Sequence, residues 1–272
     1  MAPLISIVIP TFNRAACIGA AIASVQQQTY ADWELIVVDD GSTDATAAMM
    51  RALDDPRISY VYQEQRGVAA ARNTGIARAR GALIAFLDSD DRWEPRKLEV
   101  QAAYMAAHPE NAICQTEELW IRNGRRVNPK IKHAKPSGWI FKESLKLCLV
   151  SPSAVMLRRA VFDRIDMFDE SLPACEDYDL WLRASLYYEI VTLPDALTIK
   201  VGGHDDQLSR GWGLDRYRIA ALEKLRDNPA LMPAHRDLVE NEICARARII
   251  AAGALKRGNK ELYDEYCQKL RS

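Results

Sequence analysis

Four short apolar runs alternate with helical patterns over the first 111 residues, and this alternation limits the fold more than any other feature of the chain. The runs are rich in β-branched residues and apolar on both faces, which is typical of strands inside a parallel sheet. Between them, apolar residues recur at helical spacing, as at Ile18, Ile22 and Val25. Such a sheet needs helices on both faces. The sequence therefore predicts an α/β fold, with strands in LISIVIP, ELIVV, ISYVY and LIAFL.

Beyond residue 112 the pattern changes. We expect a strand in AICQTEELWI, a helix in GWIFKESLKLCLV, a short strand in SAVMLR and a helix in CEDYDLWLRASLY. The segment EIVTLPDALTIKVGG predicts two short strands, and the pattern from about residue 214 is helical and charged. These shifts predict one domain over 1–212, in halves 1–111 and 112–212, and a helical C-terminal extension over 213–272.

Composition argues against several functional classes. The 36 basic and 37 acidic residues give a net charge of −1, so no basic excess indicates binding to nucleic acid. None of the six cysteines forms a C-x-x-C pair, and their spacing does not resemble a disulfide framework. The N-terminal apolar run is too short for a signal peptide, and no stretch approaches the roughly 18 apolar residues of a membrane span. We therefore expect a soluble, cytoplasmic protein.

Polar clusters follow three of the predicted strands. PTFNR follows the first, DDGSTD the second and DSDD the fourth. In parallel sheets ligands bind outside the carboxyl ends of the strands, so these clusters should converge on one crevice. In DDGSTD, Ser42 or Thr43 can cap a helix that starts near Asp44. Asp40 is left to accept a hydrogen bond from a nucleobase or from an arginine.

The DSDD cluster brings three carboxylates, Asp88, Asp90 and Asp91, within four residues. Like charges this close repel, so a positive partner is expected, whether arginine, a helix N-terminus or a metal ion. Mg²⁺ and Mn²⁺ take one or two carboxylates plus substrate phosphates, which makes Asp90 a candidate metal ligand. Asp88 could hold a sugar hydroxyl or a metal-bound water. The alternative is that one Asp caps the next helix and the others are solvated.

Arg72 lies in an otherwise apolar helical segment, AARNTG. It is either a surface residue or a residue that reaches the crevice and pairs with a carboxylate or phosphate through two parallel hydrogen bonds. Nothing in the segment itself decides between these two interpretations.

Four segments together resemble glycosyltransferase family 2, whose members have the GT-A fold of nucleotide-sugar transferases. They are SIVIPTFNR, QTYADWELIVVDDGSTDAT, GVAAARNTGIARARGALIAFLDSDD and EDYDLWLR, which span residues 5–183. The resemblance implies that 1–111 is the nucleotide-binding half and 112–212 the acceptor-binding half. It implies nucleotide contacts at Pro10, Thr11, Phe12, Asn13, Asp40, Arg72, Asp88 and Ser89, with Arg72 also holding Asp40.

The resemblance also implies roles for the remaining candidate residues. Asp90 would bind Mn²⁺ or Mg²⁺ against the diphosphate, with His204 as an additional metal ligand. Asp177 would be the general base, and Glu176 and Trp181 would contact the donor or acceptor sugar. The small departure is the cysteine of CEDYD, which stands where the family often has a small residue.

The implied function is metal-dependent, inverting transfer of a sugar from a nucleotide sugar, with UDP favoured, to a hydroxyl of a glycan or glycolipid. Such transfer would serve the assembly of bacterial surface polysaccharide, lipopolysaccharide or capsule, with peripheral contact at the inner face of the cytoplasmic membrane. One alternative is a sugar-phosphate nucleotidylyltransferase, but PTFNRAAC lacks the glycine-rich G-x-G-x-R loop of that class. The other is a non-catalytic nucleotide-sugar binder, but the chain keeps both the Asp-x-Asp and the Glu-Asp pair.

Overall fold

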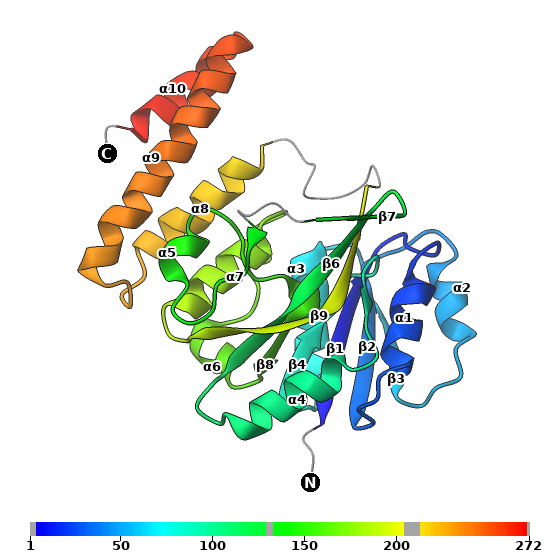
Figure 1. Ribbon diagram of the computed structural model, residues 1–272. Helices are drawn as coiled ribbons and strands as arrows, with labels where there is room; N and C mark the ends of the chain where they lie inside the picture. Colours follow the sequence, from blue (N-terminus) through cyan, green and yellow to red (C-terminus); the bar gives the residue numbers. More distant parts are fainter. Residues whose placement is uncertain (1–3, 129–132, 204–212, 271–272) are drawn as a thin grey trace.

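The computed structural model describes residues 4–128, 133–203 and 213–270. Its centre is a nine-stranded sheet in the order β3-β2-β1-β4-β8-β6-β9-β5, with β7 paired to β6 (Figure 1). The first four strands run parallel and confirm the predicted α/β half. They are β1 (Ile5–Thr11), β2 (Trp33–Asp39), β3 (Ile58–Tyr62) and β4 (Leu83–Phe86).

The second half continues the same sheet and does not form a separate one. Strand β8 joins β4 in antiparallel fashion, and β6 then pairs with β8 on one side and β9 on the other. The strands are β5 (Arg92–Trp93), β6 (Ile113–Arg122), β7 (Arg125–Val127), β8 (Val155–Arg158) and β9 (Ile190–Gly202).

Strand β9 corrects the prediction of two short strands. It is one 13-residue strand whose pairing with β6 shifts register next to Glu117. Pro194 lies at this irregularity, where it cannot donate a hydrogen bond to a ladder. The sequence pattern breaks there, but the backbone resumes pairing with β6 and runs on to Gly202. As a result, β9 carries its last residues, including Lys200, back to the carboxyl ends of β1 and β4.

Helices cover both faces of the sheet and enclose two apolar cores (Figure 1). One core packs α3, α6 and α7 on one face, and the other packs α1 and α4 on the opposite face. The helix predicted to start near Asp44 is present as α2, which begins at Thr46. One helical prediction needs correction, because GWIFKESLKLCLV is helical only in α5. The helices are α1 (Ile18–Gln26), α2 (Thr46–Arg51), α3 (Val68–Arg78), α4 (Lys97–Ala107), α5 (Phe141–Ser144), α6 (Val161–Ile165) and α7 (Glu176–Ser185).

The predicted C-terminal helices are present and stand beside α5 and α7 (Figure 1). They share a third apolar core with Tyr178 and Leu182 of α7. The buried Arg246 donates to the carbonyl oxygens of Leu145 and Lys146 and so anchors this bundle to the loop after α5. No helix of the described ranges is long and apolar enough to cross a bilayer. The three helices are α8 (Leu214–Arg226), α9 (Pro233–Lys256) and α10 (Lys260–Gln268).

Candidate active site

The ends of β1 and β2 are tied together by the backbone and by Asp40. The amide of Asp40 donates to the carbonyl oxygen of Thr11 at 2.8 Å. The Asp40 carboxylate accepts from the amides of Arg66 (2.9 Å) and Gly67 (2.8 Å) and from the side chain of Gln63 (2.7 Å). Gly67 precedes α3 with φ of 96°, a conformation that favours glycine. Asp40 therefore fixes the start of α3, a role that its predicted contact with a nucleobase did not include.

Asn13 holds the DDGSTD loop against the end of β1. Its side-chain oxygen accepts from the amides of Thr43 (2.8 Å) and Asp44 (3.3 Å), and its own amide donates to the Ser42 hydroxyl. The sequence predicts a cap at Ser42 or Thr43, but neither residue caps α2. Instead Asp44 accepts from the amide and hydroxyl of Thr46. The predicted nucleotide contact Phe12 is 38% exposed beside this loop, so its ring is open to a ligand.

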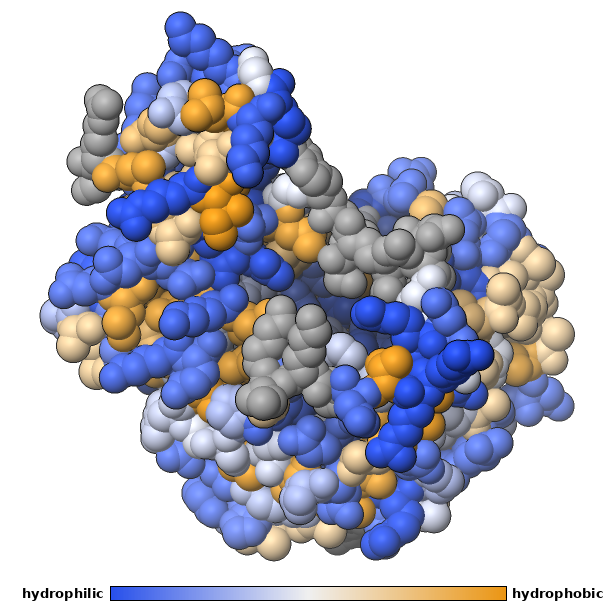
Figure 2. Space-filling view, turned by 45° about the horizontal axis from the view of Figure 1, so that its top comes forward, coloured by the Kyte–Doolittle hydropathy of each residue, from blue (hydrophilic) through white to orange (hydrophobic). Residues whose placement is uncertain are grey.

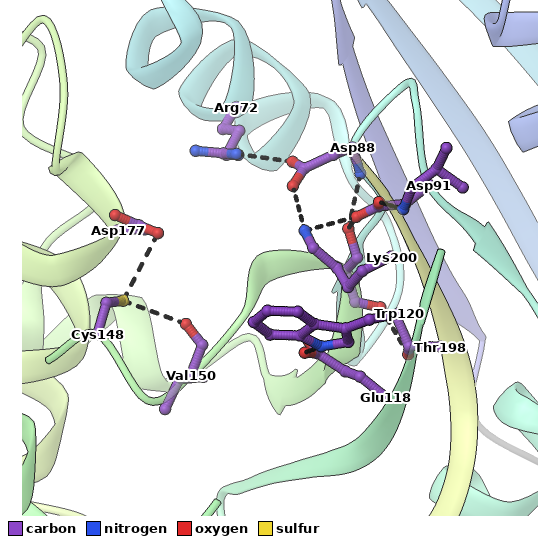
Figure 3. Close-up of polar contacts among 12 residues, drawn as sticks. Arg72, Asp88, Asp91, Glu118, Trp120, Cys148, Val150, Asp177, Thr198 and Lys200 are labelled. Carbon is purple, nitrogen blue, oxygen red and sulfur yellow. Dashed lines mark hydrogen bonds and ion pairs between the residues drawn. The ribbon is translucent and has the colours of Figure 1, made fainter. Parts of the chain in front are cut away.

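The Asp-x-Asp segment lies where β4 ends, and it meets two buried or half-buried cations (Figure 3). Arg72 Nη2 lies 2.9 Å from Asp88 Oδ1, and Lys200 Nζ lies 3.3 Å from Asp88 Oδ2. Burial opposes ionisation of Asp88, but the charges of Lys200 and Arg72 outweigh it and lower the pKa to about 2. Asp88 is therefore a carboxylate at neutral pH. The positive partner that the sequence required comes from α3 and β9.

The predicted contact of Arg72 with Asp40 is wrong. The partners of Arg72 are Asp88 and Glu176. The side chain is 4% exposed and its Nη1 donates to Glu176 Oε1. Asp88 and Glu176 hold the pKa of Arg72 above its ordinary value, although burial works in the opposite direction. Arg72 thus connects the end of β4 to the first residue of α7, where the Glu-Asp pair begins. Arg72 is therefore not a surface residue, and it pairs with two carboxylates by one hydrogen bond each.

Asp177 follows in the first turn of α7 and faces the same region (Figure 3). Its Oδ1 accepts from the amide of Tyr178 at 2.7 Å. Its Oδ2 has the Cys148 Sγ at 3.6 Å, and that thiol also lies 3.3 Å from the carbonyl oxygen of Val150. Burial and the neighbouring Asp177 raise the pKa of Cys148 well above its ordinary value, so the sulfur stays a thiol and a weak donor.

Two predicted sugar contacts are buried in the structure. Trp181 is 1% exposed and packs in the core with α3 and α6, so its ring is not accessible to a sugar. Glu176 is 5% exposed and is engaged by Arg72; burial raises its pKa. The predicted ligand His204 falls outside the described residues. Of the other predicted contacts, Thr11 and Ser89 are buried at the strand ends.

The side chains in the described ranges contain no cluster of three or more potential metal ligands. Asp91 is 1% exposed and already accepts from the Ser153 hydroxyl, the Val201 amide and Lys200. Asp90 is half-buried next to them. One carboxylate of this kind fits Mg²⁺ or Mn²⁺ that takes its other ligands from a substrate diphosphate and water.

Sequence reasoning missed Lys200 and Cys148 as residues of the site. Lys200 stands in a run, LTIKVGG, that is otherwise apolar, which is the signal that could have identified it. Its alternation with the buried Thr198 also places both side chains on the same face of β9. Cys148 carries no such signal, because its contact with Asp177 depends on the packing of the loop after α5 against α7.

Known proteins share both the sequence pattern and this architecture. The sequence profile of glycosyl transferase family 2 matches residues 6–166, more than half of the chain. An Escherichia coli enzyme, UDP-Glc:alpha-D-GlcNAc-diphosphoundecaprenol beta-1,3-glucosyltransferase WfgD, is 38% identical over 180 residues, covering 66% of this chain and 68% of that enzyme. An uncharacterized glycosyltransferase of Rickettsia bellii is 30% identical over 82% of this chain, but the match covers 35% of that protein.

Solved structures agree on the fold. The structure of Staphylococcus aureus TarS 1-349 in complex with UDP-GlcNAc superposes with a TM-score of 0.77, at 21% identity, over 98% of this chain and 81% of that one. At this identity the likeness concerns the fold alone, and it confirms the predicted GT-A architecture. Together with the profile match and the related enzymes, it shows that the chain belongs to glycosyltransferase family 2 and is a glycosyltransferase with the GT-A fold.

Proposed function

We propose that the protein transfers a sugar from a nucleotide diphosphate sugar, with UDP favoured, to a hydroxyl of a glycolipid acceptor with inversion of configuration. The observation that carries this proposal is the chain of contacts Asp88–Arg72–Glu176, which joins the Asp-x-Asp segment to the helix of Asp177. These contacts support a donor site and a base in one region. Figure 2 shows the surface hollowed between the C-terminal helices and the strand ends, with a mostly hydrophilic visible floor.

The strand ends supply the nucleotide site. Phe12 presents an exposed ring on which a base could stack, and Asp40 lies beside it, fixed by its contacts with the start of α3. Asp88 is held ionised by two cations, which suits a group that accepts hydrogen bonds from ribose hydroxyls. The name of the related Escherichia coli enzyme specifies UDP-Glc as its donor, which supports a UDP-linked donor.

Asp177 suits the role of general base. Its Oδ1 is engaged by a backbone amide, whereas the neighbour of Oδ2 is a thiol at 3.6 Å, a weak donor that leaves this oxygen able to accept a proton. Deprotonation of the acceptor hydroxyl as it attacks from the opposite face of the sugar requires no protein nucleophile, so the expected outcome is inversion.

A divalent cation, when bound, would stabilise the charge that develops on the leaving diphosphate. Asp90 is the residue of the described ranges that would hold it. Arg72 and Lys200 add fixed positive charge close to the same place, but they are already paired with carboxylates. The contribution of these two residues is therefore to orient Asp88 and Asp91.

The acceptor is inferred from the relatives. The name of the Escherichia coli enzyme specifies an acceptor sugar on diphosphoundecaprenol, a membrane lipid carrier. We accordingly place this protein in bacterial surface polysaccharide assembly, acting in the cytoplasm at the inner face of the membrane.

The test combines donor hydrolysis with nucleotide binding. Purified protein is offered UDP-glucose, UDP-N-acetylglucosamine and GDP-mannose with Mn²⁺, and release of the nucleotide diphosphate is measured. Calorimetry with UDP should show stronger binding in the presence of Mn²⁺, and Asp90→Asn should abolish that gain. Asp177→Asn should keep UDP binding but lose transfer by about 10²-fold or more, whereas the exposed Asp237→Asn serves as a control with normal rates.

Three outcomes would contradict the proposal. Normal transfer by Asp177→Asn would remove the base assignment. Binding of UDP without turnover of any donor would favour the non-catalytic binder. Pyrophosphate release from a nucleoside triphosphate and a sugar phosphate would favour the nucleotidylyltransferase.

A further inference from the structure

Trp120 differs from the other tryptophans that the structure describes. Trp33, Trp93 and Trp181 are buried, whereas Trp139 is 61% exposed. Trp120 is half-buried, and it belongs to none of the three apolar cores that the described residues form. Packing of a core therefore does not account for this large aromatic side chain on β6.

Strand pairing places Trp120 at the candidate site. Trp120 of β6 lies opposite Lys200 of β9, and paired residues of neighbouring strands point to the same face of a sheet. On that face the ammonium of Lys200 contacts Asp88 and Asp91. The indole of Trp120 therefore lies beside the Asp-x-Asp segment. Figure 3 shows it between this segment and the side of the site that carries Asp177.

Two neighbours fix the orientation of the indole. Its Nε1 donates to Glu118 Oε2 at 2.9 Å, and the ring of His133 lies with its centroid 5.1 Å away, tilted by 54°. Glu118 is held in turn by the buried Lys135, whose Nζ lies 3.2 Å from Glu118 Oε1. Because the ring nitrogen is the only polar atom of an indole and is occupied by Glu118, Trp120 offers a ligand an apolar aromatic face.

The charges around Glu118 connect Trp120 to the region of Asp177. Burial opposes ionisation of Glu118, but the charge of Lys135 helps to outweigh it and the pKa is lowered. Burial also raises the pKa of the Cys148 thiol, and the charge of Lys135 acts against this rise. Lys135 is therefore close to both groups, and Cys148 Sγ lies 3.6 Å from Asp177 Oδ2.

The nucleobase site proposed at the ends of β1 and β2 lies farther away. In the sheet, β4 and β8 separate β1 from β6. Three strand spacings correspond to about 14 Å, which is too far for a base held at β1 to stack on Trp120. The aromatic face is therefore available to a ligand on the side of the second half of the chain, residues 112–212.

We propose that the indole face of Trp120 is the surface on which a pyranose ring of the acceptor stacks while its hydroxyl reaches Asp177. This inference rests on the proposed function, because it assumes a sugar acceptor. The C–H groups on the faces of a pyranose are attracted to the negative face of an aromatic ring. The hydroxyls on its edge can bond to polar groups around the ring, as in other sites that combine aromatic and polar side chains. Trp120 thus has the role that the sequence assigned to Trp181.

Fluorine NMR of protein labelled with 5-fluorotryptophan tests this binding without catalysis. The protein has six tryptophans, and Trp120→Phe or Trp120→Tyr assigns the Trp120 resonance. With saturating UDP present, methyl glycosides of glucose, N-acetylglucosamine, galactose and mannose are titrated in turn. At least one of them should shift the Trp120 resonance and leave the Trp139 resonance unchanged.

Variants provide a second readout, the Kd of the bound glycoside from ligand-observed NMR. Trp120→Ala should raise this Kd by about tenfold or more, because the apolar contact area is lost. Trp120→Phe keeps an aromatic face and should restore most of the affinity. The exposed Trp139→Ala is the matched control and should bind the glycoside as the wild type does.

Three results would overturn the inference. One is a Trp120 resonance that no glycoside shifts, a result that the labelled wild type gives even if Trp120→Ala does not fold. Another is a folded Trp120→Ala protein with an unchanged Kd. The third is a shift on replacing UDP by UDP-glucose or UDP-N-acetylglucosamine but with no glycoside, which would assign the ring to the donor sugar. None of these titrations depends on turnover, so the proposed glycosyl transfer is decided separately by the hydrolysis screen.

Discussion

Replacing Arg72 by methionine separates the structural role of the buried ion pairs from their role in the site. Arg72 is 4% exposed and contacts Asp88 and Glu176, of which only Asp88 has a second cation, Lys200. Removal of one partner of a buried pair leaves an uncompensated charge and costs about 3–5 kcal/mol. We expect Arg72→Met to lower the free energy of unfolding by that amount at pH 8.

The loss should depend on pH in a defined direction. Burial already raises the pKa of Glu176, and without Arg72 it should rise further. The folded variant then holds a proton on Glu176 that the unfolded chain releases near pH 4.5, so its stability falls as the pH rises above that value. The destabilisation by Arg72→Met should therefore be smaller at pH 5.5 than at pH 8.

The double variant Arg72→Met/Glu176→Leu completes the test. It removes both charges and leaves Asp88 with Lys200, so most of the lost stability should return, with a coupling energy of about 2 kcal/mol or more. Urea unfolding followed by circular dichroism of the wild type, Arg72→Met, Glu176→Leu and the double variant gives the four free energies of the cycle at each pH. Transfer should stay impaired in the double variant, since Asp88 has lost its main orienting contact. Equal stability of Arg72→Met and wild type at pH 8, or no recovery in the double variant, would refute the reasoning.

Three further predictions concern packing, charge and the nucleotide site. Burial lowers the pKa of Lys97 from 10.5 to about 7, so the unfolded chain binds more protons than the folded protein between these pH values. The free energy of unfolding should therefore rise by about 4 kcal/mol from pH 7 to 10.5. Lys97→Met should remove this pH dependence in urea titrations. Gly75→Ala would gain up to about 1 kcal/mol in helix propensity, but its Cβ would clash with the side chain of Val8. Thermal unfolding should therefore show a net loss of about 1–2 kcal/mol. Phe12→Ala should weaken UDP binding in calorimetry by about tenfold, because base stacking on an aromatic ring contributes about 1–3 kcal/mol; unchanged affinity would exclude Phe12 from the site.

The first half of the fold was predictable because its signals are local. Each parallel strand is a continuous apolar run that ends in turn residues, and each helix between them has a regular apolar face. The prediction that PTFNR, DDGSTD and DSDD converge needed only the rule for parallel strand ends. For PTFNR and DDGSTD this prediction is confirmed by the contact between Asp40 and Thr11 and by the hydrogen bonds between Asn13 and the DDGSTD loop.

The partners of the charged residues were not predictable in the same way. Arg72 was expected to hold Asp40, but the first turn of α3 itself occupies Asp40 through two backbone amides. Trp181 lies on the helix that carries Asp177 and was expected to face a sugar, whereas the core takes that side of α7. In both cases the sequence predicted the correct region for the residue, but tertiary packing determined which residues it contacts.

Lys200 shows why the site is a property of the whole sheet and not of its first half. Asp91 is buried, and its cation comes from β9, which pairs with β6 along one edge and with β5, directly after Asp91, along the other. Ser153, which precedes β8, donates to the same carboxylate, and its carbonyl oxygen accepts from Trp93 Nε1. The negative charge that residues 1–111 contribute to the proposed donor site is thus balanced by residues of 112–212. A chain that folded only residues 1–111 would leave Asp91 without its contacts to Ser153, Val201 and Lys200, so the donor site should form only when both halves are folded.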